Sequence, residues 1–485
     1  MITTSNGLLF QGFCWDLPAD NRHLLRLTEK VAELADMGIT SIWLPPAYKG
    51  TSIYDTGYSV YDLYDIGEFD QKGTVATKYG TVSELETLIK TLHVHNIRVY
   101  ADVVLNHKAG ADETERFMAV PVDPMDRTKE IGEPREIEGW TKFTFPGRGD
   151  KYSDFKWNHE HFSAVDLDQM TGDMGIFRIL GENKGFGFAV DSQYGNYDYL
   201  MHSDIDQAHP DVREELFRWG EWYFKRFNYD GMRLDAIKHI DEPFMLEFIE
   251  EMRSRVNDDI YVVGEYWITD VERMRTYLDK LQFHMQLFDV ALHFNFERAG
   301  KEEAEYDLRG IFVDTLVNAN PLNVVTFVDN HDSQPGQALE SFVADWFKPL
   351  AYALILLRHD GYPCLFYGDY YGIRNGEGAK KKVLEPLLAA RKYRAYGPQE
   401  DYFFDKNAIA FVRKGDMEFP YSGLVCVLSN GQENSVEIQL GEDRAGQIWF
   451  DLTNNRPEEL VLDEKGGAIF PVNGRSVSVW AEKTN

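Results

Sequence analysis

The sequence predicts a (β/α)8 TIM barrel of the α/β class, with an inserted irregular β-rich domain after the third strand and a C-terminal antiparallel β-sandwich. Short apolar runs alternate with longer segments of helical period, polar residues follow several of these runs, and short alternating runs replace this pattern after about residue 398. The chain has 485 residues, which is too long for a single hydrophobic core of ordinary size. Two or three domains are therefore expected.

Eight short runs rich in Val, Ile, Leu and Tyr are predicted as strands. Such runs, each followed by a helix, are typical of a parallel sheet buried on both faces, and eight of them indicate a closed barrel. The predicted strands are residues 8–13, 41–44, 98–105, 231–236, 261–266, 290–296, 324–328 and 364–367. Helical patterns between them cover residues 22–37, 83–95, 211–227, 242–256 and 342–357.

The spacing of carboxylates along the chain predicts where the insertion lies. Asp235 and Glu265 are 30 residues apart, and Glu265 and Asp332 are 67 apart, which are one and two βα units of about 30 residues. The 133 residues from Asp102 to Asp235 exceed one unit by about 100. The surplus predicts an inserted domain at residues 108–208.

The last part of the chain is predicted to form a separate antiparallel domain. Its apolar runs are short and alternate with polar residues, and Asn-Gly pairs such as the one at Asn430 mark turns between them. The predicted domains are therefore a barrel of residues 1–107 and 209–397, the insertion at 108–208, and a C-terminal domain of residues 398–485.

Composition and charge restrict the class of ligand. The formal net charge of −30 disfavours nucleic acid and anionic membrane surfaces, which would be repelled, and leaves neutral ligands such as carbohydrates open. Cys14, Cys364 and Cys426 are too far apart in sequence for a disulfide framework or a zinc site. Since the sequence shows neither a secretory leader nor a membrane-spanning run, we expect a cytoplasmic protein, and we expect it to be a monomer.

Ionisable side chains gather where the predicted strands end. In a barrel these ends face one site, so the side chains are expected to converge. Crowded carboxylates repel one another, which raises at least one pKa and places a proton donor beside an anion, the pair that glycoside cleavage requires. The third strand gives Asp102, Asn106 and His107, and the fourth gives Arg233 and Asp235, with Lys238 and His239 just beyond it; the fifth gives Glu265, and the seventh gives His331 and Asp332.

Two other interpretations of these residues stay open. A single Asp at a strand end is more often a helix cap or a turn residue, so the catalytic interpretation depends on the joint occurrence at βα-unit spacing. A metal-dependent hydrolase barrel also gathers Asp and His at strand ends, although His107, His239 and His331 lack His-x-His spacing.

A loop near the end of the predicted insertion contains three aspartates within nine residues. Asp198, Asp204 and Asp206 offer the carboxylate oxygens that hard cations prefer, and Asn106 at the barrel end is a candidate fourth ligand. From the local sequence alone, capping of turns by the same aspartates is an equally good explanation.

Four segments, in order along nearly the whole chain, resemble the signature regions of the α-amylase family, glycoside hydrolase family 13. They are Asp102-Val-Val-Leu-Asn-His107, Gly231-Met-Arg-Leu-Asp-Ala-Ile-Lys-His239, Val263-Gly-Glu-Tyr-Trp267 and Phe327-Val-Asp-Asn-His-Asp332. Residues 57–62 resemble the second-strand motif of that family. Residues 196–206, followed by 209–211, and residues 326–336 resemble the bacterial liquefying α-amylases and their cytoplasmic relatives.

The resemblance implies a retaining mechanism and a role for each residue. It implies Asp235 as the nucleophile, Glu265 as the general acid and then base, and Asp332 as the group that holds and distorts the sugar. The implied substrate-binding residues are Tyr58, which stacks on the sugar, His107 and His331, which donate hydrogen bonds to it, Arg233, which keeps Asp235 ionised, and Lys238 and His239 on the leaving-group side.

The resemblance also implies one structural Ca²⁺ between the barrel and the insertion, which makes the insertion cation-binding. Some secreted relatives carry a further calcium–sodium cluster, but Ser163 and Gly187 stand where those relatives have ligand aspartates, so one ion is expected. The implied ligands are Asn106, Asp198, Asp204 and the main-chain carbonyl of His239.

The predicted function is endo-hydrolysis of α-1,4-glucosidic bonds in starch, glycogen or maltodextrins, so an α-glucan is the expected partner. An oligosaccharide-forming amylase or a transglycosylase of the same family is an alternative, because water and a sugar hydroxyl attack the same intermediate. A non-catalytic sugar-binding relative and a metal-dependent hydrolase are further alternatives.

Overall fold

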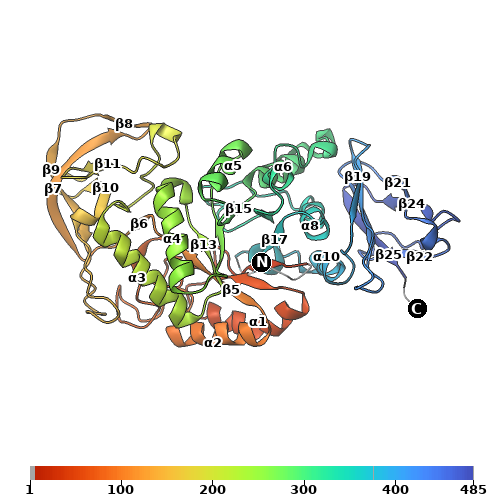
Figure 1. Cartoon of the computed structure of the whole chain (residues 1–485), viewed down its shortest axis with the longest axis horizontal. Helices are drawn as coiled ribbons and strands as arrows, with labels where there is room; N and C mark the ends of the chain where they lie inside the picture. The colour runs from red at the N-terminus through yellow and green to blue at the C-terminus, as the bar shows by residue number, and fades with distance from the viewer. Residues whose placement is uncertain (1–5, 375, 484–485) are drawn as a thin grey trace.

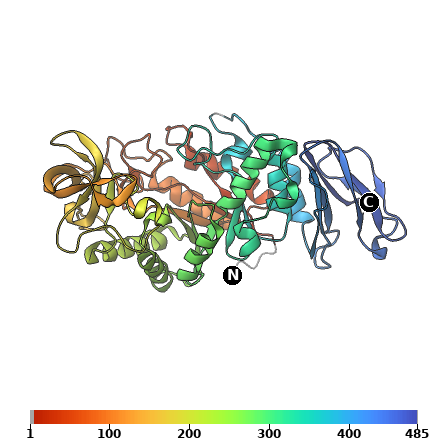
Figure 2. The same ribbon diagram turned by 90° about the horizontal axis from the view of Figure 1, so that it is seen from above.

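The computed structural model describes residues 6–374 and 376–483. A β-rich part, a central barrel with its helices, and C-terminal sheets follow one another along the long axis of the molecule (Figure 1). The view from above shows the same order, with the two outer parts on opposite sides of the barrel (Figure 2). Residues 1–5 and 484–485, at the ends of the predicted first and last domains, lie outside the described residues.

The central part is a closed barrel of parallel strands, which confirms the predicted fold class. Strands that are consecutive in this set are also neighbours in the barrel. They are almost entirely buried, because helices cover the outside and side chains fill the interior. The strands are β1 (Leu9–Gln11), β2 (Ser41–Trp43), β5 (Arg98–Val103), β13 (Gly231–Leu234), β14 (Tyr261–Gly264), β15 (Gln286–Phe288), β16 (Val324–Phe327) and β17 (Tyr362–Phe366).

The predicted sixth strand, residues 290–296, is wrong. This segment begins the helix α6 (Val290–Glu302), and the sixth strand is the preceding β15. The Asp289 side chain caps the helix by accepting a hydrogen bond from the Leu292 main-chain N–H, at 3.0 Å. Most residues in the first turns of α6 are buried. Its apolar residues are therefore not restricted to one face of the helix, and the run resembles a buried strand.

Helices connect the barrel strands, and most of the predicted helical segments are confirmed. The segment predicted at 342–357 is helical only from Lys348, where α8 begins with a proline in its first turn, the position at which proline is tolerated. The helices besides α6 are α1 (His23–Asp36), α2 (Val82–Val94), α3 (Pro210–Phe227), α4 (Glu242–Arg255), α5 (Val271–Lys280), α7 (Leu316–Ala319), α8 (Lys348–Leu357), α9 (Tyr367–Tyr371) and α10 (Lys381–Tyr393).

The segment inserted after β5 forms one antiparallel sheet, which is more regular than the expected irregular domain. Its first and last strands, β6 and β12, pair with each other, so both ends of the segment lie together at the barrel. The strands are β6 (His107–Lys108), β7 (Glu113–Asp123), β8 (Asp126–Glu130), β9 (Arg135–Lys142), β10 (Phe162–Asp168), β11 (Asp173–Ile179) and β12 (Ser203–Ile205). A small hairpin of β3 (Lys49–Gly50) and β4 (Val60–Asp62) precedes it.

The C-terminal sheets are antiparallel, as predicted. A core of apolar side chains that includes Trp449, Phe470 and Trp480 lies between them. The larger sheet has the order β18 (Gln399–Tyr402), β19 (Ala408–Arg413), β20 (Leu424–Ser429), β25 (Ser476–Glu482), β22 (Ile448–Asp451) and β23 (Leu460–Val461). The smaller one pairs β21 (Asn434–Gln439) with β24 (Gly467–Val472).

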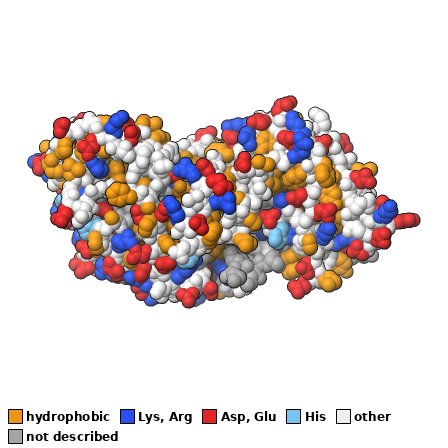
Figure 3. All heavy atoms as spheres, turned by 45° about the horizontal axis from the view of Figure 1, so that its top comes forward, with side chains coloured by type: hydrophobic (Ala, Val, Ile, Leu, Met, Phe, Trp, Pro, Cys, Tyr) orange, Lys and Arg blue, Asp and Glu red, His pale blue; other side chains and the backbone are white. Residues whose placement is uncertain are grey.

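The surface carries charges of both signs. In the space-filling view, acidic and basic side chains are interspersed over the visible face and no single sign covers it (Figure 3). No helix within the described residues is both long and apolar enough to cross a membrane.

Candidate active site

Arg233 on β13 is 1% exposed and contacts three carboxylates. Its Nη1 lies 3.0 Å from Asp102 Oδ1 and 2.6 Å from Asp235 Oδ1, and its Nη2 lies 2.6 Å from Glu265 Oε2. Arg233 pairs in register with Asp102 on β5 and Val263 on β14, and Asp235 follows two positions later along the same strand direction. The strand register thus brings carboxylates of three neighbouring strands onto one guanidinium.

One guanidinium faces three carboxylates in this cluster, so some of these carboxyl groups keep their protons to a higher pH than usual. Burial raises the pKa of Glu265 to about 7; Arg233 lowers it and Asp235 raises it. Burial likewise raises the pKa of Asp102 to about 6. Asp235 accepts a charge-assisted hydrogen bond of 2.6 Å from Arg233. A proton donor thus stands beside a carboxylate that a guanidinium neutralises.

The turn after β16 adds His331 and Asp332 to the cluster. Burial raises the pKa of Asp332 well above its ordinary value, and the Glu265 carboxylate raises it further. His331 Nε2 lies 3.2 Å from Asp332 Oδ2, and the His331 ring stacks on Tyr58 with ring centroids 5.1 Å apart. A flat aromatic face and two polar groups therefore border the same carboxylates.

Tyr58 and His107 connect this face to the third strand. The Tyr58 hydroxyl donates a hydrogen bond of 2.8 Å to Asp102 Oδ2. His107 Nε2 donates one of 2.8 Å to the main-chain oxygen of Tyr58. The structure thus brings together the three predicted catalytic carboxylates and four of the six predicted substrate-binding residues, the four being Tyr58, His107, Arg233 and His331.

Lys238 and His239 lie one turn beyond β13, in the short helix η3 (Ile237–His239). Ala236 has a left-handed backbone (φ 48°) that turns the chain out of the strand. Lys238 Nζ donates to the main-chain oxygen of Trp267 at 3.3 Å, and His239 Nδ1 donates to that of Tyr197 at 2.7 Å. His239 therefore lies against the inserted segment and Lys238 against the turn after β14, rather than among the carboxylates.

Three residues of the cluster are not among the predicted site residues. Gln11 Nε2 lies 3.0 Å from His331 Nδ1, and Trp43 Nε1 donates a hydrogen bond of 2.8 Å to Asp102. The ring of Trp15 stacks parallel to Tyr58, with centroids 5.9 Å apart. A polar Gln11 inside an apolar strand is a weak signal in the sequence, whereas the two tryptophans resemble ordinary core residues.

Three of the four predicted calcium ligands, Asn106, Asp198 and Asp204, lie together where β6 pairs with β12. Asn106 Oδ1 is buried and has no hydrogen-bond partner among the described residues, while Asn106 Nδ2 donates to Asp204 Oδ1 at 3.3 Å. Burial raises the pKa of Asp198 to about 7, and it raises that of Asp204 well above its ordinary value, with the Asp198 charge adding to the effect. An orphaned amide oxygen beside two buried carboxylates is a donor set that suits a hard cation such as Ca²⁺.

Asp206, the third aspartate of this loop, has a different partner. Its Oδ2 accepts a hydrogen bond of 2.5 Å from Lys184 Nζ. The same ammonium group donates to the main-chain oxygens of Glu160 and Phe162. A lysine side chain therefore neutralises Asp206.

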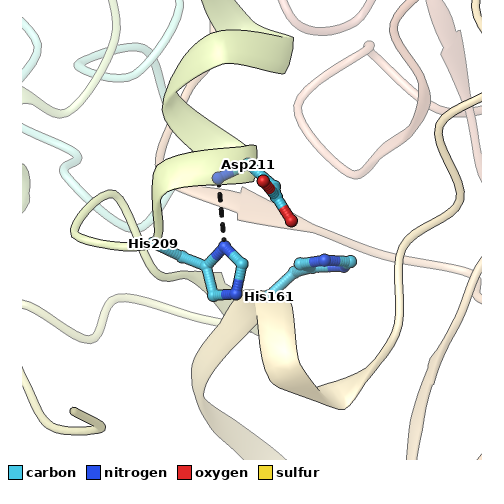
Figure 4. A group of neighbouring side chains, drawn as sticks. All are labelled: His161, His209 and Asp211. Carbon is cyan, nitrogen blue, oxygen red and sulfur yellow. Dashed lines mark hydrogen bonds between the residues drawn. The ribbon is translucent and has the colours of Figure 1, made fainter.

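His161, His209 and Asp211 are the one group with three closely spaced metal-ligand atoms found in the described part of the chain (Figure 4). Both rings accept a hydrogen bond at Nδ1, His161 from the Asn158 main-chain N–H at 3.0 Å and His209 from that of Asp211 at 3.2 Å. A histidine that binds metal through Nε2 carries its proton on Nδ1, but here each Nδ1 faces an N–H group. The group therefore fits helix capping better than metal binding.

Comparison with known proteins places this site in a family. The model of the α-amylase catalytic domain matches residues 23–408. An α-amylase of Bacillus licheniformis is 47% identical over 99% of this chain and 94% of that protein. A glucan 1,4-α-maltohexaosidase of Bacillus sp. strain 707 is 47% identical over 99% of this chain and 93% of that protein, and a cytoplasmic α-amylase of Escherichia coli strain K12 is 43% identical over 98% of each. The chain therefore belongs to the α-amylase family and is a glycoside hydrolase.

Proposed function

We propose that the protein is an α-amylase that cleaves internal α-1,4-glucosidic bonds of starch, glycogen or maltodextrins with retention of configuration. The observation that carries this proposal is the guanidinium of Arg233, which bonds both Asp235 and Glu265. Two carboxylates on one guanidinium are close enough for the separation of about 5–5.5 Å that a retaining pair needs. Full-length relatives named as amylases support the substrate class.

Each of the two carboxylates takes one part of the first chemical step. Glu265 gives its proton to the glycosidic oxygen while Asp235 attacks the anomeric carbon, so the C–O bond to the leaving sugar breaks as the bond to Asp235 forms. In the second step, Glu265 accepts a proton from water, and that water attacks the same carbon and releases Asp235. Because its pKa is raised to about 7, Glu265 can carry the proton that the first step consumes.

The residues around the pair hold the sugar. Asp332 is positioned to accept hydrogen bonds from the hydroxyls of the sugar at the bond to be cut, and His331 donates to the same ring. His107 gives its Nε2 proton to the main-chain oxygen of Tyr58, so it supports the residue that stacks on the sugar. Tyr58 offers its ring face for stacking. Lys238 and His239 lie beyond the fourth strand, where they would meet the sugar on the leaving-group side.

The distribution of products from amylose against time tests this function. Endo-hydrolysis should shorten the chains quickly and give a broad series of maltooligosaccharides before small sugars accumulate. One early product of a single length would favour an oligosaccharide-forming amylase, an activity that the name of the 47% identical maltohexaosidase makes the leading alternative. Products longer than the substrate would identify a transglycosylase.

The pH dependence of kcat/KM should report the proton on Glu265. The first step needs Glu265 protonated, so activity is present below the pKa of this group and is lost as the pH rises through it. Since burial raises that pKa from 4.5 to about 7, the alkaline limb should lie near neutral pH. A pH profile with short maltooligosaccharides checks this. A limb at pH 4–5, the range of an ordinary glutamate, would contradict it.

The purified protein should contain one calcium ion per chain, and a chelator should lower Tm. Without the ion, the buried carboxylates of Asp198 and Asp204 face each other; a ligand at about 1,000 times its Kd adds about 4 kcal/mol of stability. Metal analysis and melting curves with and without chelator measure both effects. Asp204→Asn should lose the ion and Asp206→Asn, the matched control, should keep it. Absence of calcium together with full activity in chelator would refute the site.

The remaining expectations are proposals of the same kind. We propose a cytoplasmic monomer, for which the E. coli relative named as cytoplasmic gives support on location. We propose domain boundaries at 107/108, 208/209 and 397/398, which limited proteolysis can test.

A further inference from the structure

A buried ion cluster lies directly behind the turn that carries His331 and Asp332. It consists of Lys348 at the start of α8, Asp329 two residues after β16, and Asp369 in α9, and each of the three is 1% exposed. Lys348 Nζ lies 2.9 Å from Asp329 Oδ2 and also contacts Asp369 Oδ1. One ammonium group thus joins α8, α9 and the segment that follows β16.

The Asp329 carboxylate holds the turn from behind. Its Oδ1 accepts a hydrogen bond of 2.8 Å from Ser333 Oγ, and it also accepts the Val343 main-chain N–H at 3.3 Å. Within the turn, Asn330 Oδ1 accepts the main-chain N–H groups of Asp332 at 2.9 Å and of Ser333 at 2.8 Å. A continuous chain of bonds therefore runs from Lys348 to the backbone of Asp332.

Lys348 supplies the positive charge that both aspartates of this cluster face. Burial raises the pKa of Asp329, Lys348 lowers it, and Asp369 raises it. The other titratable groups that face the cluster are neutral: burial lowers the pKa of His293 to about 4 and raises that of Tyr352. Within the described residues, the ion pairs of both aspartates end on Lys348. Removing it leaves two buried carboxylates facing each other without a counter-ion.

A core does not need such a cluster for stability alone. Replacing a buried ion cluster by apolar side chains of similar volume is often neutral or stabilising, whereas removing a single member leaves an unpaired charge. The presence of two aspartates and a lysine in one buried cluster can therefore be explained by the segment that the cluster orients, which is the turn that carries Asp332.

We propose that Lys348 is a positioning residue for glycoside cleavage: through Asp329 and Ser333 it fixes the turn that presents His331 and Asp332 to the substrate. The inference rests on the proposed function, since that function gives Asp332 its task. Displacing a substrate-holding group by about 1 Å costs about 100-fold in rate. Such a loss should appear mainly in kcat, because the ring distortion that Asp332 supports develops toward the transition state.

Lys348→Met tests this, with Lys49→Met as the matched control. Lys49 is an equally buried lysine paired with Asp65 at 3.3 Å, in the hairpin after β2. We expect Lys348→Met to lower kcat on maltooligosaccharides about 100-fold with KM changed less than about threefold. Lys49→Met should lower Tm without a loss of kcat. Equal effects of both variants on kcat per folded molecule would overturn the proposal.

Two further variants separate the turn from general destabilisation. Asp329→Asn breaks the ion pair on the side of the turn, whereas Asp369→Asn keeps the pair between Lys348 and Asp329. The first should lower kcat at least tenfold more than the second, and Lys348→Met/Asp369→Asn should recover part of the activity lost in Lys348→Met. Equal losses in the two Asn variants would refute the proposal even if Lys348→Met does not fold.

Hydrogen exchange of the peptide covering residues 329–343 gives a readout that does not depend on activity. Lys348→Met should make the amides of Asp332 and Ser333 exchange faster than in the wild type, and Lys49→Met should not. Unchanged exchange would contradict the proposed path of bonds. A wild type that does not cleave amylose would refute the proposed function, and exchange would still decide whether Lys348 orders the turn.

Discussion

Replacing Asp235 by Asn should lower kcat on amylose by about 10⁵–10⁶-fold, the largest effect expected for any single substitution in this protein. The amide keeps the shape of the carboxylate and its place beside Arg233, 2.6 Å away in the wild type, but it cannot form the bond to the anomeric carbon. Initial rates of reducing-end release, with protein concentration corrected for the folded fraction, measure the loss.

Asp289→Asn is the control for removing a buried carboxylate elsewhere in the barrel. Asp289 is fully buried and caps α6, and it touches none of the three active-site carboxylates. Its substitution should lower Tm and leave kcat per folded molecule within about threefold of the wild type. If Asp235→Asn retained more than about 1% of kcat, the assignment of Asp235 as nucleophile would be wrong.

Replacing Glu265 by Gln should lower kcat on amylose by about 10³–10⁴-fold while binding of maltooligosaccharides is retained. The side-chain amide of this variant cannot supply the proton that the leaving sugar needs, but it keeps the side-chain volume next to Arg233. The loss should be much smaller in the first step for a glycoside whose leaving group is a stable anion, because that step then needs no proton. Values of kcat/KM on both substrates, which report the first step, and a calorimetric titration with maltooligosaccharide provide the comparison.

The same variant separates the alternatives for function. Full activity of Glu265→Gln would remove the glycosidase mechanism and favour a metal-dependent hydrolase. A wild type that binds maltooligosaccharides but cleaves none would identify a non-catalytic sugar-binding relative. An equal loss on both substrates would show that Glu265 orders the site rather than donating the proton.

The sequence predicts the barrel well because strands buried on both faces and helices with one apolar face have different patterns. It fails at the sixth strand, where β15 has three residues and the following helix is buried through most of its first turns, so the longer apolar run receives the strand prediction. The sequence also underestimates how regular the sheet of the insertion is. One of its pairings, β6 with β12, joins residues almost 100 positions apart, so no local pattern predicts it.

The charged part of the candidate site is predictable because carboxylates follow several apolar strands at the spacing of βα units, whereas a single one would be an ordinary cap or turn residue. Asp235 and Glu265 stand out for this reason, and their spacing places them on neighbouring strands. Gln11, Trp15 and Trp43 do not stand out, because a stacked or capping aromatic residue differs from a core residue only through its tertiary partners. The same holds for Lys348, whose two aspartates come from other elements.

Whether Asp235 and Glu265 form a retaining pair is decided by the configuration of the newly formed reducing end. Proton NMR of the wild type acting on a maltooligosaccharide, recorded before mutarotation, distinguishes the two anomers. We predict that the α-anomer appears first and that the β-anomer accumulates only through mutarotation. Release of the β-anomer as the first product would show a single displacement by water and would contradict a retaining pair.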